Sequence, residues 1–191
     1  MLKYLDFPKG ISLVYGGPAT GKSTLCFQLV ASNPGKVIFI DTENSFNIER
    51  IQQMNPLFDL NNLILFHASR YSEQYAAVKS LKNVKNIDLV IVDSFTHYYR
   101  KKLQDGIVIR PPTIKMLDML KQLEVPVLLT SQVYSMDGKT HCVAGDLFER
   151  FSSYILVLDS KETAKGLKRN LVIEGTTMDI PFIITDKGLS V

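Results

Sequence analysis

The feature that most limits the fold of this chain is one run that fits the phosphate-binding loop pattern: Gly16-Gly17-Pro18-Ala19-Thr20-Gly21-Lys22-Ser23-Thr24. Gly16 and Gly21 allow backbone conformations in which successive N–H groups turn inward around a phosphate. Lys22 supplies a charge for the β- and γ-phosphates, and the Ser23 hydroxyl is suited to ligate Mg²⁺. An apolar run precedes the loop and a helical pattern follows it. The sequence therefore predicts a nucleoside triphosphate site, with ATP and Mg²⁺ as the expected ligands.

Strands and helices alternate along the first two-thirds of the chain, which predicts a three-layer α/β fold with a mainly parallel central sheet. The expected strands cover residues 11–15, 36–41, 63–66, 89–93 and 125–130. The expected helices cover residues 25–31, 47–54, 72–81 and 113–123. After these, residues 154–158, 170–173 and 182–185 read as short strands with no helix between them. That pattern indicates antiparallel strands added to the edge of the sheet.

Length and composition fit one ordinary globular domain over residues 1–191, because the chain has 46% hydrophobic and 21% charged residues and contains no repeat or linker. We expect no separate N-terminal DNA-binding domain. No apolar run reaches the roughly 18 residues that span a bilayer, and no signal sequence is evident, so we expect a cytoplasmic protein without a membrane partner. Cys26 and Cys142 form neither a disulfide framework nor a zinc site, and we expect Cys26 to lie in the core.

Three polar residues follow predicted strands at the positions where parallel sheets bind ligands. Asp93 ends an apolar strand and is suited to hold Mg²⁺ opposite Ser23, although an aspartate also begins many turns. Glu43 is placed to deprotonate an attacking water, or else it is a surface carboxylate or helix cap. Gln132 is placed to bind the γ-phosphate, or else it is a loop amide. With the phosphate-binding loop, these residues predict one site at the carboxyl edge of the sheet.

A basic run follows Asp93, at Arg100, Lys101 and Lys102, and Tyr98 and Tyr99 precede it directly. Cations neutralise phosphates and aromatic rings stack on bases, so this run is a candidate contact for single-stranded DNA. A solvated loop is the alternative interpretation, because a net charge of +3 does not by itself indicate nucleic acid. The three histidines have no metal-ligand spacing and are interpreted as surface or hydrogen-bonded residues: His67, His97 and His141.

These motifs together resemble the ATPase core of RecA-like recombinases, and most closely the short archaeal RadB paralogues. The matching stretches occur in the expected order and span nearly the whole chain: 14–24, 40–44, 49–51, 91–94, 98–100, 130–133 and 184–189. The phosphate-binding loop is shared by many families, whereas the Asp-Thr-Glu run at 41–43 and the Val-Asp-Ser run at 92–94 are more selective.

The resemblance implies Glu43 as the water-activating carboxylate, Gln132 as the γ-phosphate sensor, and a catalytic role for Lys22. It also implies that the segment after Asp93 and residues 133–145 face DNA. Family members act on single-stranded DNA in homologous recombination, and RadB-like members resemble accessory proteins with weak ATP turnover. Residues 174–177 stand where full recombinases often carry a basic cluster, and no linker phenylalanine for docking to a neighbour is evident, so filament formation does not follow from the resemblance.

Three functions are therefore in competition. The first is a RadB-type ATPase modulated by DNA, acting with a recombinase or another repair protein. The second is an ATP-switched adaptor that hydrolyses little, and the third is a KaiC-like ATPase outside DNA repair. A homo-oligomer is a further candidate assembly for each of them.

Overall fold

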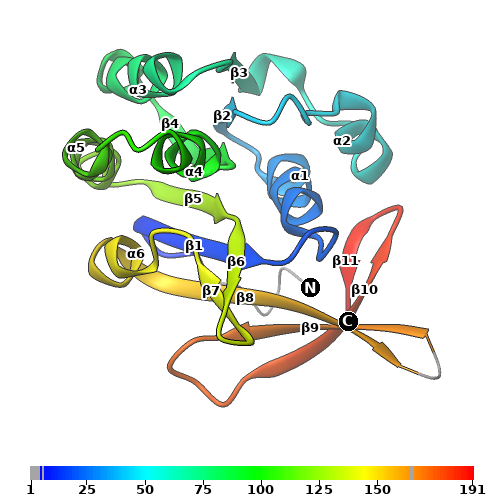
Figure 1. Ribbon diagram of the computed structural model, residues 1–191. Helices are drawn as coiled ribbons and strands as arrows, with labels where there is room; N and C mark the ends of the chain where they lie inside the picture. Colours follow the sequence, from blue (N-terminus) through cyan, green and yellow to red (C-terminus); the bar gives the residue numbers. More distant parts are fainter. Residues whose placement is uncertain (1–4, 6, 164–165) are drawn as a thin grey trace.

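A nine-stranded sheet forms the middle layer of the computed structural model, which describes residue 5 and residues 7–163 and 166–191 (Figure 1). The strand order across the sheet is β11-β10-β9-β8-β1-β5-β4-β2-β3. The strands are β1 (Gly10–Gly16), β2 (Lys36–Asp41), β3 (Leu63–His67), β4 (Ile87–Asp93), β5 (Pro126–Ser131), β8 (Ser152–Thr163), β9 (Gly166–Ile173), β10 (Asp179–Thr185) and β11 (Gly188–Ser190).

The predicted mainly parallel sheet with antiparallel C-terminal strands is confirmed. Parallel pairs join β8 to β1, β1 to β5, β5 to β4, β4 to β2 and β2 to β3, whereas β9, β10 and β11 are antiparallel. One detail differs, since β8 was expected to be part of the antiparallel edge but pairs parallel with β1. The reason is that β8 follows a helix, which supplies the crossover that a parallel strand needs.

Helices cover both faces of the sheet and complete the three layers (Figure 1). The α-helices are α1 (Lys22–Ser32), α2 (Ile48–Met54), α3 (Tyr71–Ser80), α4 (His97–Gln104), α5 (Arg110–Lys121) and α6 (Gly145–Phe151). Alternate residues of each central strand face opposite layers: in β2, Val37 and Phe39 belong to the apolar cluster on the side of α1 and α2, while Ile38 and Ile40 belong to the cluster on the side of α3 and α5. Cys26 of α1 is fully buried, as predicted. No helix in the described ranges is long and apolar enough to cross a membrane.

Two short helices and a hairpin were not predicted from the sequence. α4 occupies the basic run that was interpreted as a candidate loop, and α6 precedes β8. The strands β6 (Val133–Met136) and β7 (Lys139–Cys142) pair as a separate two-stranded sheet after Gln132. Asp137 and Gly138, in the predicted loop tip, both have positive φ, which is typical of the tight turns that close β-hairpins.

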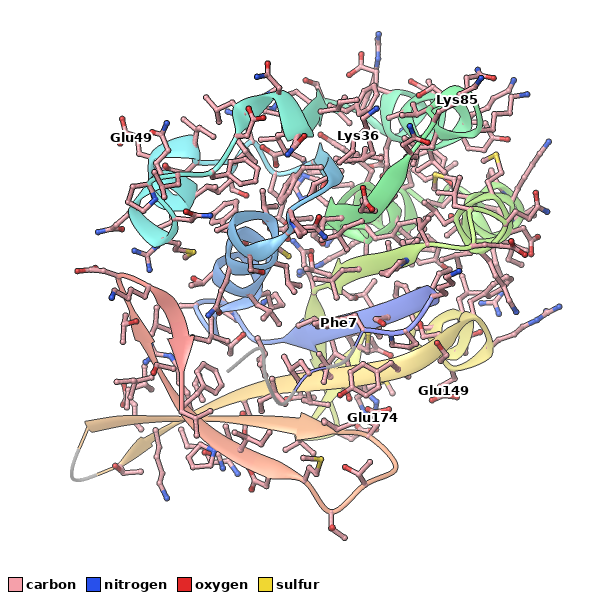
Figure 2. The ribbon with its side chains drawn as sticks, turned by 180° about the vertical axis from the view of Figure 1, so that it is seen from behind. Phe7, Lys36, Glu49, Lys85, Glu149 and Glu174 are labelled. Atoms are coloured by element: carbon pink, nitrogen blue, oxygen red, sulfur yellow. The ribbon has the colours of Figure 1, made fainter. Side chains whose placement is uncertain are left out.

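The C-terminal strands pack against α1 and α2, next to the phosphate-binding loop. The Gln28 side chain of α1 pairs with the backbone of Leu189, accepting from its N–H at 3.0 Å and donating to its carbonyl oxygen at 3.2 Å. Arg50 of α2 donates to the carbonyl oxygens of Thr185 and Asp186 between β10 and β11. At the other end of the described chain, Phe7 lies beside β1 and β8 (Figure 2) and packs edge-on against Tyr154. The contacts of Gln28 and Arg50 hold β10 and β11, and with them Ile184, beside the phosphate-binding loop.

We expect Gly16→Ala to destabilise the fold, because Gly16 ends β1 against the backbone of β8. A Cβ at Gly16 would lie 2.1 Å from the carbonyl oxygen of Leu158, which is a backbone atom and cannot rotate away. The expected loss is about 3 kcal/mol in the free energy of unfolding, measured by urea denaturation of the nucleotide-free protein.

Gly17→Ala is the matched control for this prediction. Its Cβ would meet only the Thr20 methyl carbon, at 3.8 Å, which is ordinary van der Waals contact. The two variants should therefore differ in urea midpoint, and equal midpoints would contradict the proposed clash.

Candidate nucleotide-binding site

The phosphate-binding loop joins the end of β1 to the start of α1. Gly21, directly before the helix, has a φ of 107°, a left-handed conformation that residues with a Cβ rarely adopt. The Thr20 hydroxyl donates to the Gly17 carbonyl oxygen at 2.9 Å and holds the loop closed. Because α1 begins at Lys22, the free N–H groups of its first turn lie at the loop. The loop thus combines amide donors with a helix N-terminus, which suits an anion.

Lys22 is half-buried and folds back over the loop. Its ammonium group donates to the carbonyl oxygens of Gly16 at 2.9 Å and Gly17 at 2.6 Å. Burial lowers the pKa of Lys22, and the negative charges of Asp93 and Glu43 act in the opposite direction. The direct partners of the ammonium are neutral carbonyls, so a phosphate would be a stronger acceptor for the same group.

Asp93 ends β4 with its carboxyl group buried. Oδ1 accepts a hydrogen bond from the Thr130 hydroxyl at 2.5 Å, whereas Oδ2 is buried and has no donor among the described residues. Burial raises the pKa of Asp93, and the hydroxyl groups of Thr130 and Ser23 oppose the rise. An unpartnered buried carboxylate oxygen next to a serine hydroxyl fits the oxygen ligands that Mg²⁺ requires.

Glu43 follows β2 and Gln132 follows β5, and their side chains contact each other across the end of β4. Gln132 Nε2 donates to Glu43 Oε1 at 2.8 Å, and Gln132 Oε1 accepts from the guanidinium of Arg100 at 3.5 Å. His97 Nδ1 lies 3.5 Å from the same Glu43 oxygen. Four side chains from three separate segments therefore form one polar network.

The predicted site residues converge on one cavity of about 560 Å³ at the carboxyl edge of the sheet. This size is typical of small-molecule sites. Ten of the twelve residues predicted for the nucleotide site line it: Gly16, Pro18, Ala19, Gly21, Lys22, Ser23, Thr24, Glu43, Asp93 and Gln132. Gly17 and Thr20 hold the shape of the loop through their mutual hydrogen bond and do not line the cavity.

The basic run does not form one continuous patch, because α4 turns its side chains in different directions. Arg100 lines the nucleotide cavity, Lys101 lies 5.4 Å from the centroid of the Tyr98 ring, and Lys102 pairs with Asp105 at 3.9 Å. The expected stacking of Tyr98 and Tyr99 on bases is wrong for this structure. Both rings are buried, and the Tyr98 hydroxyl donates to the Ala68 carbonyl oxygen at 2.8 Å.

Sequence reasoning did not place two side chains that lie near Glu43. Arg100 was assigned only to DNA, yet it lies at the nucleotide cavity, and His97 was interpreted as a surface or hydrogen-bonded residue but faces Glu43. Ile184 of β10 also lines the cavity, near Gly21. The spacing of His97 and Arg100 could have indicated that they lie together, because residues three apart are neighbours on a helix. That helix was not predicted from the sequence.

Comparisons with known proteins identify the relatives of this chain. Residues 10–108 match the model of a family described as an AAA domain. The DNA repair and recombination protein RadB of Methanoculleus marisnigri is 33% identical, with 95% of this chain and 88% of that protein covered. RadB of Methanococcus maripaludis is 30% identical, with 96% of this chain and 92% of that protein covered.

A solved structure supports the same relationship. The crystal structure of the RadB recombinase superposes with a TM-score of 0.79 at 31% identity, covering 98% of this chain and 93% of that one. The resemblance inferred from the phosphate-binding loop and the strand-end residues is thereby confirmed. The chain belongs to the RadB family of DNA repair and recombination proteins.

Proposed function

We propose that this protein binds ATP with Mg²⁺, hydrolyses it slowly, and contacts single-stranded DNA as an accessory protein in homologous recombination. The observation that carries the proposal is the convergence of Lys22, Asp93 and Glu43 on one cavity, each from a different strand end. The printed names of the relatives, which are DNA repair and recombination proteins, support the biological context.

The nucleotide part of the proposal assigns a role to each group in the cavity. The amides at the loop and the Lys22 ammonium bind the phosphates, and Ser23 and Asp93 would hold Mg²⁺. When bound, Mg²⁺ neutralises charge on the phosphate oxygens. Glu43 accepts a proton from the attacking water, and Gln132 holds Glu43 through the 2.8 Å hydrogen bond. Arg100, on the same network, offers a positive charge from within the chain.

The DNA part rests on two segments that border the nucleotide cavity. Arg100 of α4 and Val133 of β6 both line it, so the segment after Asp93 and the β6–β7 hairpin are in direct reach of a bound nucleotide. Exposed apolar side chains lie on these segments beside the cations, with Leu103 52% and Met136 51% exposed. Mixed cationic and apolar surface is suited to a backbone with unstacked bases.

A second candidate function, an ATP-switched adaptor, is favoured by one observation. Residues 174–177 contain no cation, and Glu174 accepts a hydrogen bond from the Tyr15 hydroxyl at 2.6 Å. This segment therefore supplies no positive charge to a neighbouring site. Turnover measured with and without single-stranded DNA separates the two functions, because an adaptor would bind ATP and show no stimulated hydrolysis.

The proposal predicts salt-sensitive binding of single-stranded DNA through the cations of α4. Replacing Arg100, Lys101 and Lys102 with glutamine should weaken binding and reduce the slope of log K against log salt by roughly 0.7 for each of these cations that contacts a phosphate, up to about 2. Fluorescence anisotropy of a labelled oligonucleotide across a salt series measures this slope.

A charge-matched triple variant at the other edge of the sheet is the control for the DNA prediction. The control replaces three other exposed lysines with glutamine and so removes the same charge: Lys79 of α3, Lys82 of the turn after it and Lys121 of α5. Equal losses in both triple variants would assign the binding to net charge and contradict a DNA contact at α4. No binding by the wild type at low salt would remove the DNA part of the proposal.

A further inference from the structure

His97 contacts Glu43 from a second cavity and does not line the nucleotide cavity. Glu43 borders two cavities: the nucleotide cavity, and a second cavity of about 470 Å³ lined by His97, His67 and Lys101. Within the second cavity, His97 Nδ1 lies 3.5 Å from Glu43 Oε1. The side chain of His97 is 20% exposed and that of Glu43 is 34% exposed, so the contact is partly shielded from solvent.

The His97 ring is held in place by its surroundings. His97 begins α4, and its backbone N–H donates to the Ser94 carbonyl oxygen at 3.3 Å. Its ring packs edge-on against Tyr98, with centroids 4.7 Å apart, and Tyr98 is itself anchored to Ala68. A ring fixed in this way offers a donor at a defined position, and loses little conformational freedom when it makes a hydrogen bond.

The contact engages only one of the two carboxylate oxygens. Gln132 and His97 both approach Oε1 of Glu43, at 2.8 Å and 3.5 Å, from two different segments of the chain. The hydrogen bond from Gln132 and the nearby His97 ring limit the rotation of the carboxylate and leave Oε2 for another partner. In a site that activates water, that partner is the water proton.

We propose that His97 is a positioning residue that, together with Gln132, orients Glu43 toward the attacking water. The inference rests on the proposed ATP hydrolysis and adds a residue to it. In its neutral form His97 donates from Nδ1–H to Oε1 of Glu43, and Oε2 receives the water proton. His97 does not line the nucleotide cavity, and its contact with Glu43 connects it to a residue that does.

The charge state of His97 should make ATP turnover depend on pH. Burial and the nearby Lys101 lower the pKa of His97, whereas Glu43 and Asp41 raise it, and His67 lines the same cavity. Because the net effect lowers the pKa of His97 below its ordinary value, the neutral imidazole predominates at pH 7. As the pH falls through this lowered pKa, His97 becomes a cation, binds Glu43 as an ion pair and makes the carboxylate a weaker base. Turnover should therefore fall on the acid side.

A titration of the nucleotide-free protein tests the contact without any activity measurement. NMR of the protein labelled at histidine follows the pKa of His97, with the His97→Asn variant identifying its signals among the three histidines. Glu43→Gln removes a charge that raises this pKa, so the pKa of His97 should decrease in that variant. An unchanged titration of His97 in Glu43→Gln would overturn the proposed pairing.

Turnover measurements test the consequence for hydrolysis. His97→Ala should bind nucleotide within about twofold of wild type but turn over about 10-fold more slowly, a part of the 10²–10⁴-fold that a general base contributes. His97→Asn keeps an N–H donor without the titration, so it should retain more turnover, and its acid limb should move to lower pH. His67→Asn is the control, because His67 lies 3.5 Å from Asp41 rather than beside Glu43 and should keep wild-type turnover.

The outcomes separate this inference from the proposed function. Wild-type turnover and pH profile in His97→Ala, with nucleotide affinity intact, would overturn the positioning role. An absence of turnover in the wild type would instead refute the proposed hydrolysis, and the histidine titration would still decide whether His97 and Glu43 are paired.

Discussion

Replacing Lys22 with alanine should reduce the affinity for ATP by about 100-fold, equivalent to about 3 kcal/mol of binding free energy. In the nucleotide-free protein the Lys22 ammonium contacts two carbonyl oxygens of its own loop, at 2.9 Å and 2.6 Å. A bound polyphosphate would replace these neutral acceptors with charged ones, so most of the loss appears in binding and little in folding. Titration with a fluorescent ATP analogue in the presence of Mg²⁺ measures the affinity.

A second lysine with a similar contact serves as the control. Lys36 donates to the Lys85 carbonyl oxygen at 3.1 Å, where β2 and β4 begin, and both residues are labelled in Figure 2. Lys36→Ala removes the same charge and a comparable hydrogen bond, yet should bind ATP as the wild type does. If Lys22→Ala also bound ATP with wild-type affinity, the loop would not be the phosphate site, and the proposed function would fail.

The main elements of the site were predictable because their positions depend on local sequence. The loop motif fixes a strand before it and a helix after it, and buried parallel strands appear as apolar runs. Glu43, Asp93 and Gln132 were found by one rule, that the carboxyl ends of parallel strands meet at the same edge. The structure places all three on one cavity.

What the sequence did not reveal depends on contacts between distant segments. α4 is only eight residues long and carries few apolar side chains, and it is stabilised by the burial of Tyr98 and Tyr99 in the fold. Because that helix was not predicted, Arg100 and the two lysines after it were interpreted as one patch. On a helix, however, consecutive side chains point about 100° apart. The parallel pairing of β8 with β1 likewise depends on α6, which the sequence pattern did not predict.

Glu43→Gln should lower ATP turnover by about 10²- to 10³-fold, within the range that removal of a general base produces. A glutamine has nearly the same shape and can still accept the hydrogen bond from Gln132, but it cannot take a proton from water. Nucleotide affinity should be unchanged or higher, because the substitution removes a negative charge from a cavity meant for phosphates. Single-turnover hydrolysis and equilibrium binding, measured on the same preparation, separate the two effects.

Glu49→Gln gives this prediction its control, since Glu49 is an exposed carboxylate on α2, six residues further along the chain and outside the cavity lining (Figure 2). It removes an equal charge and should leave turnover unchanged.

If Glu43→Gln kept wild-type turnover while Lys22→Ala abolished binding, ATP would be bound at the proposed cavity but hydrolysed without the proposed base. If the wild type itself bound ATP and hydrolysed none, with or without single-stranded DNA, the conformation set by ATP binding would be the functional output, as in an adaptor. A water-activating carboxylate requires a large loss of turnover in Glu43→Gln, no loss in Glu49→Gln, and intact ATP binding in both variants.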